Sequence, residues 1–225
     1  MVWRFVDAPV SGQINSGVYL AQTQDDFDGV NLVCDDVYGR ECGWLGPDAI
    51  PLTKDPYHAS STYLVAADAG RLVGIMRLVA DSAQGLPVEQ FASVDPLRGA
   101  PGSRRLIECQ RLMVLNAYRN VRLEAFPYGV FAGLVKGCLH WCLTHGWTHI
   151  VADLFLNTAT TPMTTLLAIG FEDTGIEFVD TELAEPDRSV ALLLRVGELF
   201  SRTFRSNSPF YRYLIERDPT VRVYH

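Results

Sequence analysis

The chain has 225 residues, of which 48% are hydrophobic and 20% charged, and its net charge is −7. This length and composition are typical of a globular protein with a substantial core, and they exclude a disordered chain. No apolar run approaches the roughly 20 residues that span a bilayer, and the negative charge argues against nucleic acid as the main partner.

The amino-terminal segment carries little structural signal. Its opening, MVWRFVDAPV, has no basic segment followed by an apolar stretch, so we expect no secretory signal and a cytoplasmic location. Residues 1–25 show little periodicity and support no assignment. Apolar residues then recur at helical spacing over 27–42, which predicts an amphipathic helix that ends near Gly43. A proline-rich loop follows.

A β-hairpin is the clearest element of the sequence. Two apolar runs, 63–67 and 72–80, flank a turn at 68–70. Their nearly continuous apolar character predicts central strands that are covered on both faces. Residues 106–115 are predicted to form a third strand.

A helix is predicted over 127–145, with Pro127 in its first turn and Gly146 at its end. Cys138 and Cys142 lie one turn apart, and His145 follows on the same side. Such a set is able to bind a metal, but cysteines in an apolar stripe more often fill a core, and we expect no metal. The chain has five cysteines, an odd number, which favours reduced thiols.

The remaining elements alternate. Residues 148–156 are predicted to form a fourth strand, and Thr161 to cap a short helix with Pro162 in its first turn and Gly170 at its end. Residues 174–180 and 189–196 are predicted as antiparallel strands. The tail, 198–217, is predicted to be helical with a break at Pro209.

This order of elements predicts a mixed α/β (α+β) fold in which helices flank a mostly antiparallel sheet. The sequence contains no internal repeat and no clear linker. We therefore expect a single domain over 1–225, with a helical extension from about residue 198.

Three charged residues interrupt apolar strands and are candidates for function. Arg77 lies within GIMRLVA, and Glu108 and Arg111 lie within LIECQRLMVL. A charge in such surroundings is costly unless it is paired or functional, and both explanations remain open. Strand alternation places Glu108 and Arg111 on opposite faces unless the strand is bulged. We expect one to face a cleft and the other to anchor the fold.

Several short motifs occur in a recognisable order. They are Tyr38 with Trp44, Asp55-Pro-Tyr57, Gly74-Ile-Met-Arg77-Leu78, Phe91, Glu108-Cys-Gln-Arg111 and Ala168-Ile-Gly-Phe171. From Val37 to Arg111, and more loosely to Phe171, the sequence resembles the GNAT superfamily. Within that superfamily it is most similar to the acyl-homoserine-lactone synthases and N-acyl amino acid synthases.

The resemblance implies a GNAT-type N-acyltransferase. Its donor would be a phosphopantetheine thioester on an acyl carrier protein, or an acyl-CoA, with no tightly bound cofactor, and its acceptor a small amine such as an amino acid. By the resemblance, Glu108 assists deprotonation of the amine, directly or through water, and Arg77 and Arg111 order the catalytic site. The implied substrate-binding residues are Trp44, Asp55, Tyr57, His58, Phe91, Met113 and Leu115, with backbone N–H groups at Met113–Leu115 holding the thioester oxygen.

Two positions depart from the lactone-forming branch. Cys34 and His58 stand where that branch has an arginine and an aspartate. Both changes fall on the acceptor side, so they argue against S-adenosylmethionine as the acceptor and against lactone formation.

A basic stretch is the candidate surface for the donor. Residues 98–124 hold six arginines against two glutamates, a net charge of +4. This stretch is either a solvated loop or a docking patch for an acidic carrier protein. The patch would use Arg104, Arg105, Arg119 and Arg122. Two alternative functions remain: a CoA-dependent N-acetyltransferase acting on a small amine or a protein, and a non-catalytic module that binds acyl carrier protein.

Overall fold

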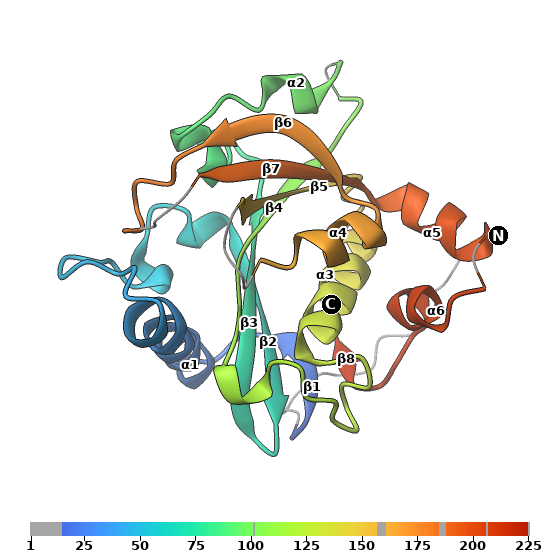
Figure 1. Cartoon of the computed structure of the whole chain (residues 1–225), viewed down its shortest axis with the longest axis horizontal. Helices are drawn as coiled ribbons and strands as arrows, with labels where there is room; N and C mark the ends of the chain where they lie inside the picture. Colours follow the sequence, from blue (N-terminus) through green and yellow to red (C-terminus); the bar gives the residue numbers. More distant parts are fainter. Residues whose placement is uncertain (1–14, 101, 157–160, 185–187, 206, 225) are drawn as a thin grey trace.

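A computed structural model describes residues 15–100, 102–156, 161–184, 188–205 and 207–224 (Figure 1). The strands are β1 (Gly17–Leu20), β2 (Ser61–Asp68), β3 (Arg71–Ala80), β4 (Leu106–Val114), β5 (His149–Phe155), β6 (Glu172–Phe178), β7 (Ser189–Arg195) and β8 (Val221–Arg222). The α-helices are α1 (Gln24–Cys34), α2 (Asp95–Arg98), α3 (Val130–Thr144), α4 (Met163–Ile169), α5 (Val196–Arg205) and α6 (Pro209–Ile215).

The strands of the described residues form one mixed sheet in the order β6-β7-β5-β4-β3-β2-β1-β8. Only the β4–β5 and β1–β8 pairs are parallel. In Figure 1, β2 and β3 run nearly vertically and β6 and β7 nearly horizontally, so the sheet is strongly twisted across its centre. The predicted α/β class with a mostly antiparallel sheet and the predicted hairpin are confirmed.

Helices cover the sheet on both faces. Helix α1 packs on one face against β2 and β3, and α3 packs on the other against β1 to β4 (Figure 1). Two glycines allow α3 to approach closely: a Cβ at Gly137 would lie 2.8 Å from a methyl of Val18, and one at Gly133 would lie 2.5 Å from the ring of Phe126. The helix therefore lies directly on the sheet.

The start and end of the first helix differ from the prediction. Helix α1 begins at Gln24 because Thr23 caps it: the Thr23 hydroxyl accepts from the amide of Asp26, and the Asp26 carboxylate accepts from the amide of Thr23. After Cys34 the chain continues as a π-helical segment, Asp35–Glu41. This wider turn brings Tyr38 to the sheet side, where it meets Trp44.

Two predicted helix starts are wrong. Pro127 does not lie in the first turn of α3, because Gly129, with φ of +90°, precedes that turn and redirects the chain. Thr161 does not cap α4: its hydroxyl donates to the carbonyl of Phe155 at 2.9 Å, and Pro162 occupies the N-cap position. The predicted ends at Gly146 and Gly170 are confirmed by their positive φ.

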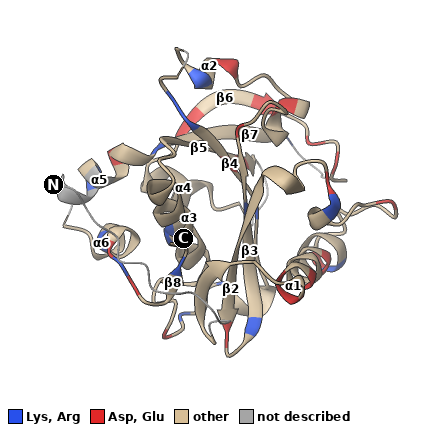
Figure 2. Cartoon of the chain, turned by 180° about the vertical axis from the view of Figure 1, so that it is seen from behind, with Lys and Arg blue, Asp and Glu red and all other residues tan. Residues whose placement is uncertain are grey.

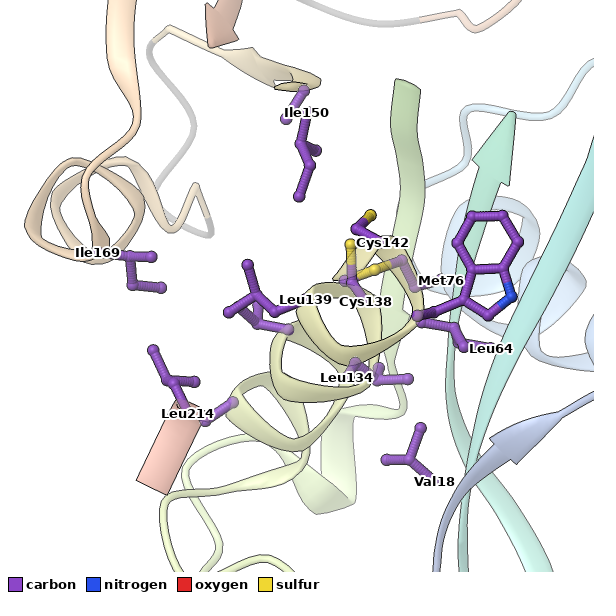
Figure 3. Packing of buried hydrophobic residues seen from close by; sticks show 14 of the residues in the cluster. Val18, Leu64, Met76, Leu134, Cys138, Leu139, Cys142, Ile150, Ile169 and Leu214 are labelled. Carbon is purple, nitrogen blue, oxygen red and sulfur yellow. The ribbon is translucent and has the colours of Figure 1, made fainter. Parts of the chain in front are cut away.

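Cysteines of α3 fill the core, as expected. Cys138 and Cys142 are buried, and Figure 3 shows their sulphur atoms gathered with that of Met76 between the helix and the sheet. Ring stacking holds His145 against Trp141. No described helix combines the length and the hydropathy needed to cross a membrane.

The exposed edge of the sheet is acidic. Strand β6 is the outermost strand beside β7 and carries Glu172, Asp173 and Glu177, which Figure 2 shows in red. Charged residues on an edge strand oppose pairing with strands of other molecules. We therefore assign these three charges to protection of the edge.

Candidate functional site

A β-bulge in β4 shapes the site. Ile75 pairs with Met113 and Arg77 with Gln110, so Arg111 and Leu112 together face the single residue Met76. Arg111 adopts a φ of +51°, which is uncommon for a residue with a side chain. Because of the extra residue, the side chains of Glu108 and Arg111 no longer point to opposite faces of the sheet. Both side chains border the same small pocket, although simple strand alternation would place them on opposite faces.

A cavity of about 770 Å³ opens where β4 and β5 part. The two strands pair from Leu106↔His149 to Cys109↔Ala152, and no further pair follows among the described residues. Beyond that point residues of both strands line the cavity. Its walls come from both faces of the sheet: Val135 and Leu139 of α3 on one side, Tyr38 and Trp44 on the other. The cavity thus passes through the sheet, with a mainly apolar end under α3.

Two carboxylates lie at this gap. Glu108, 2% exposed, lines only the small pocket beside the cavity, whereas Asp153 lines both. Glu108 accepts hydrogen bonds from the amide of Val88 at 3.0 Å and from Gln110 Nε2 at 3.3 Å. Burial, and then the charge of Asp153, raise the pKa of Glu108 well above its usual range. Burial also raises the pKa of Asp153, to about 6.

Arg111 supplies the positive charge beside these acids. Its guanidinium lies 3.5 Å from Asp180 and 3.1 Å from Glu182, and it sits 5.7 Å from the centre of the Tyr38 ring. Burial opposes its charge, but Tyr38 and the carboxylates of Asp180, Asp153 and Glu182 raise its pKa. Arg111 therefore stays charged and links β4 to the segment that follows β6.

Arg77 acts at a distance from the cavity. Its side chain is 2% exposed, forms two hydrogen bonds to the Asp55 carboxylate, and donates from Nε to Ser61 Oγ at 2.8 Å. Neither Arg77 nor Asp55 lines the cavity or the small pocket. The pair fastens the loop before β2 to the middle of the sheet.

The other residues of that loop have different surroundings. Tyr57 is buried, and its pKa is raised by burial and by nearby acids, the first of them Glu108. The ring of His58 packs against Phe27 and Tyr63, and its Nδ1 lies 3.2 Å from the Tyr63 hydroxyl. Tyr57 therefore lies near the carboxylates, whereas His58 packs away from the cavity.

The aromatic and strand residues divide between the two pockets. Trp44 lines the cavity and packs against Tyr38 and Phe155. Phe91 lines only the small pocket, where it stacks on Phe178 with ring centres 5.8 Å apart. This places Phe91 beside the carboxylates and outside the lining of the main cavity.

The expected oxyanion donors need one correction. Met113 lines the cavity, but Leu115 does not. The amide of Leu115 donates to the carbonyl of Val73 at 2.9 Å and is therefore not free to bind a thioester oxygen. Of the expected segment, Met113 and Val114 are the residues that line the cavity.

The basic stretch does not form one patch. Arg104 and Arg105 precede β4, and Arg119 and Arg122 follow it, so about 27 Å of strand separates the two pairs. The first pair binds backbone carbonyls, of Leu97 and of His145, away from the cavity. Arg98, within the same stretch, is held by Asp81, Glu89 and Asp95.

The second pair lies at the cavity itself. Arg119 and Arg122 both line it, and Arg119 is bound to Glu41 and to the carbonyl of Val114. Arg122 is exposed. Of the four arginines expected to bind a carrier protein, Arg119 and Arg122 therefore lie beside the cavity, and Arg104 and Arg105 do not.

Sequence reasoning missed several residues of the site. Asp153 interrupts the apolar strand HIVADLF in the same way as Glu108 interrupts β4, so the same criterion would have identified it. Gln110 lies between the two motif residues, and a neutral side chain in a strand carries no comparable signal. Asp180 and Glu182 follow β6 in an irregular segment, and no local pattern connects them to Arg111.

Comparisons with known proteins identify the family and the fold. The family model described as N-acyl amino acid synthase FeeM matches residues 30–154. No curated protein sequence matches the chain.

Several solved structures share the fold. FeeM, an N-acyl amino acid synthase from uncultured soil microbes, is similar with a TM-score of 0.63 and 17% identity, over 87% of this chain and 96% of FeeM. BjaI, a CoA-dependent acyl-homoserine lactone synthase solved with SAM and isopentyl-CoA, gives 0.60 and 19%, over 86% of this chain and 90% of BjaI. A protein of Desulfovibrio desulfuricans assigned to the GNAT family of acetyltransferases gives 0.51 and 11%, over 80% and 98%. These similarities establish the GNAT fold.

Proposed function

Because this chain belongs to the FeeM family of N-acyl amino acid synthases and is therefore an acyltransferase, we propose that it transfers an acyl group from a carrier thioester to the amine of an amino acid or a related small molecule. The observation that carries the proposal is the cavity through the sheet where β4 and β5 part. A thioester and an amine entering from opposite faces would meet at this gap.

The apolar end of the cavity suits the acyl chain. Its wall includes Val135, Leu139, Leu166 and Phe171, which are all buried. Each methylene that leaves water for such a wall contributes about 0.8 kcal/mol. The volume of about 770 Å³ lies well within the usual range for sites that enclose whole ligands. Both features favour an acyl group longer than acetyl over the alternative of an N-acetyltransferase.

The polar part of the site suits the amine. Trp44 and Tyr38 form the wall on the other face, and Arg111 and Asp153 lie between the two ends. The acceptor amine is protonated in solution and must lose a proton before it attacks. Glu108 takes part in that step, and because it is sealed from the cavity it acts through a group or a water molecule that lies between.

Backbone amides of β4 would hold the thioester oxygen. The pairing register of β4 with β5 stops at Cys109 among the described residues, although β4 continues to Val114. Its N–H groups that point toward β5 beyond that residue face the cavity. Fixed donors at this position would stabilise the negative charge that develops on the carbonyl oxygen during attack.

The donor is proposed to enter past Arg122. Phosphopantetheine on a carrier protein and coenzyme A both present phosphate, and BjaI was solved with an acyl-CoA. An exposed arginine at the cavity mouth would attract either donor, and an acidic carrier surface would add further attraction that weakens with salt.

A product assay tests the proposal. The purified protein is incubated with acyl carrier protein or CoA thioesters of two to sixteen carbons and a mixed pool of amino acids and amines, and amides are identified by mass spectrometry. The expected product is a new amide with an acyl group longer than acetyl. Consumption of donor to free fatty acid without amide, or no consumption of any donor, would refute the proposal.

A further inference from the structure

Asp153 occupies a particular place at the gap. It is the first residue of β5 after the last pair with β4, Cys109↔Ala152. On its other side it remains paired with Ala191 of β7, so its backbone is fixed. Of the described residues, only Asp153, Gln110 and Arg111 line both the cavity and the small pocket. Asp153 is therefore the carboxylate that connects the two spaces.

The two carboxylates at the gap have different access to a substrate. Both Glu108 oxygens accept hydrogen bonds from protein groups, and the residue is 2% exposed. No Lys, Arg or His of the described residues lies within salt-bridge distance of Asp153, since Arg111 pairs with Asp180 and Glu182 instead. Asp153 thus presents a carboxylate to the cavity that no salt bridge occupies.

Resting on the proposed acyl transfer, we propose that Asp153 is the catalytic residue that takes the proton from the acceptor's ammonium group, and that Glu108 acts behind it as a positioning residue. This assigns direct contact with the amine to a residue outside the Glu108-Cys-Gln-Arg111 motif. Glu108 and Gln110 then fix the small pocket against which Asp153 rests.

The proton balance of the reaction is simple. The ammonium gives one proton to the Asp153 carboxylate and becomes a free amine. Its nitrogen forms a C–N bond to the thioester carbonyl, and collapse of the tetrahedral intermediate breaks the C–S bond. The second nitrogen proton passes to the departing thiolate, which leaves as a thiol. Asp153 returns its proton to solvent through the cavity, so one proton is released for each amide formed.

The charges around Asp153 suit this role. Burial, as the first cause, and Asp180 raise its pKa to about 6, while Arg111 lowers it. Glu108 and Cys109 face it from β4, and Arg77 of β3 acts on Glu108. Burial and the charge of Asp153 raise the pKa of Glu108 well above its usual range, whereas the pKa of Asp153, at about 6, leaves the Asp153 carboxylate mostly ionised at neutral pH. A base of this strength is well matched to neutral conditions.

Two isosteric substitutions test the assignment. In the full-length protein, D153N is expected to lower kcat at least about 100-fold, the usual loss for a general base. E108Q keeps the size and shape of Glu108, which does not line the cavity, and is expected to lower kcat less than about tenfold. The wild-type rate should rise with pH through a midpoint near 6, and E108Q should keep that midpoint. Exposed Asp48 lies outside both pockets, and D48N serves as the control of unchanged rate.

Chemical rescue and infrared titration complete the test. Formate should restore part of the activity of D153A, because the space left opens to the cavity, and it should not restore E108A. A carboxyl band that titrates near pH 6 should disappear in D153N and persist in E108Q. A large loss in E108Q with activity kept in D153N, or a band that disappears only in E108Q, would overturn the proposal. The infrared band does not depend on turnover, so it tests the assignment of Asp153 even if the wild type forms no amide. Absence of amide would refute the proposed function and not the assignment of the titrating carboxyl group.

Discussion

Replacing Asp55 by asparagine should destabilise the protein strongly, because it leaves a buried cation without its anion. The guanidinium of Arg77 is 2% exposed and has Asp55 as its salt-bridge partner in the described residues; Ser61 and the face of Tyr63, 5.8 Å from the ring centre, supply the remaining contacts. The side-chain oxygen of asparagine can accept one of the two hydrogen bonds from Arg77, but its NH₂ group would face the second N–H group of Arg77, and both are donors.

The magnitude follows from burial. Breaking a buried ion pair by removing one partner costs about 3–5 kcal/mol. Asp55 is 20% exposed, so water can partly replace it, which favours the lower end, about 3 kcal/mol. At 2–4 °C per kcal/mol for a domain of this size, the melting temperature of D55N should fall by about 6–12 °C.

Urea and thermal denaturation of D55N, with D48N in the same loop as control, measure the effect. Asp48 is exposed, so D48N should stay within about 0.5 kcal/mol of the wild type. The double variant R77M/D55N removes both charges and should lose less stability than the two single losses added together. A D55N variant as stable as the wild type would refute the view that this pair fastens the loop.

Three further outcomes are expected. Between pH 6.5 and about 4 the free energy of unfolding should fall by about 3 kcal/mol. The reason is that His140 has a pKa of about 6.5 in the unfolded chain, whereas burial lowers its pKa in the folded protein to about 4. In H140Q, urea titrations should show a smaller change of the unfolding free energy over this pH range. R122E should weaken the binding of carrier protein in low salt, as measured by calorimetry, whereas R104E should not. Equal weakening by both variants would contradict entry of the donor past Arg122. L166F should shift the preferred acyl chain to shorter lengths in donor competition, and an unchanged preference would place the chain elsewhere.

Periodicity was sufficient for most of the fold. The hairpin β2–β3, the strands β4, β5 and β7 and the helix α3 follow from local runs of apolar residues, and the glycines Gly146 and Gly170 mark where helices end. Helix caps were harder to predict. Thr161 donates its hydroxyl to a carbonyl of the preceding strand and does not cap α4, because the path of the chain between the two elements brings these groups together.

The site was only partly readable from the sequence, for a physical reason. Motif residues Glu108 and Arg111 were identified, but their shared pocket depends on a bulge opposite Met76, and alternation in a single strand cannot reveal a bulge. Arg111 meets Asp180 across 69 residues of sequence, a pairing that only the order of strands produces. The basic stretch failed as one patch for a related reason, because a strand carries its two ends to opposite sides of the molecule.

The dependence of kcat/KM for amide formation on acyl chain length tests the central claim most directly. If the chain lies along the apolar wall under α3, each added methylene should raise kcat/KM about fourfold at most, from the 0.8 kcal/mol of its burial, until the cavity is filled. Acyl thioesters from two carbons upward, with the acceptor held constant, should therefore show a steep rise followed by a plateau or a fall. An acetyl thioester that is used as well as the longer ones would contradict the account.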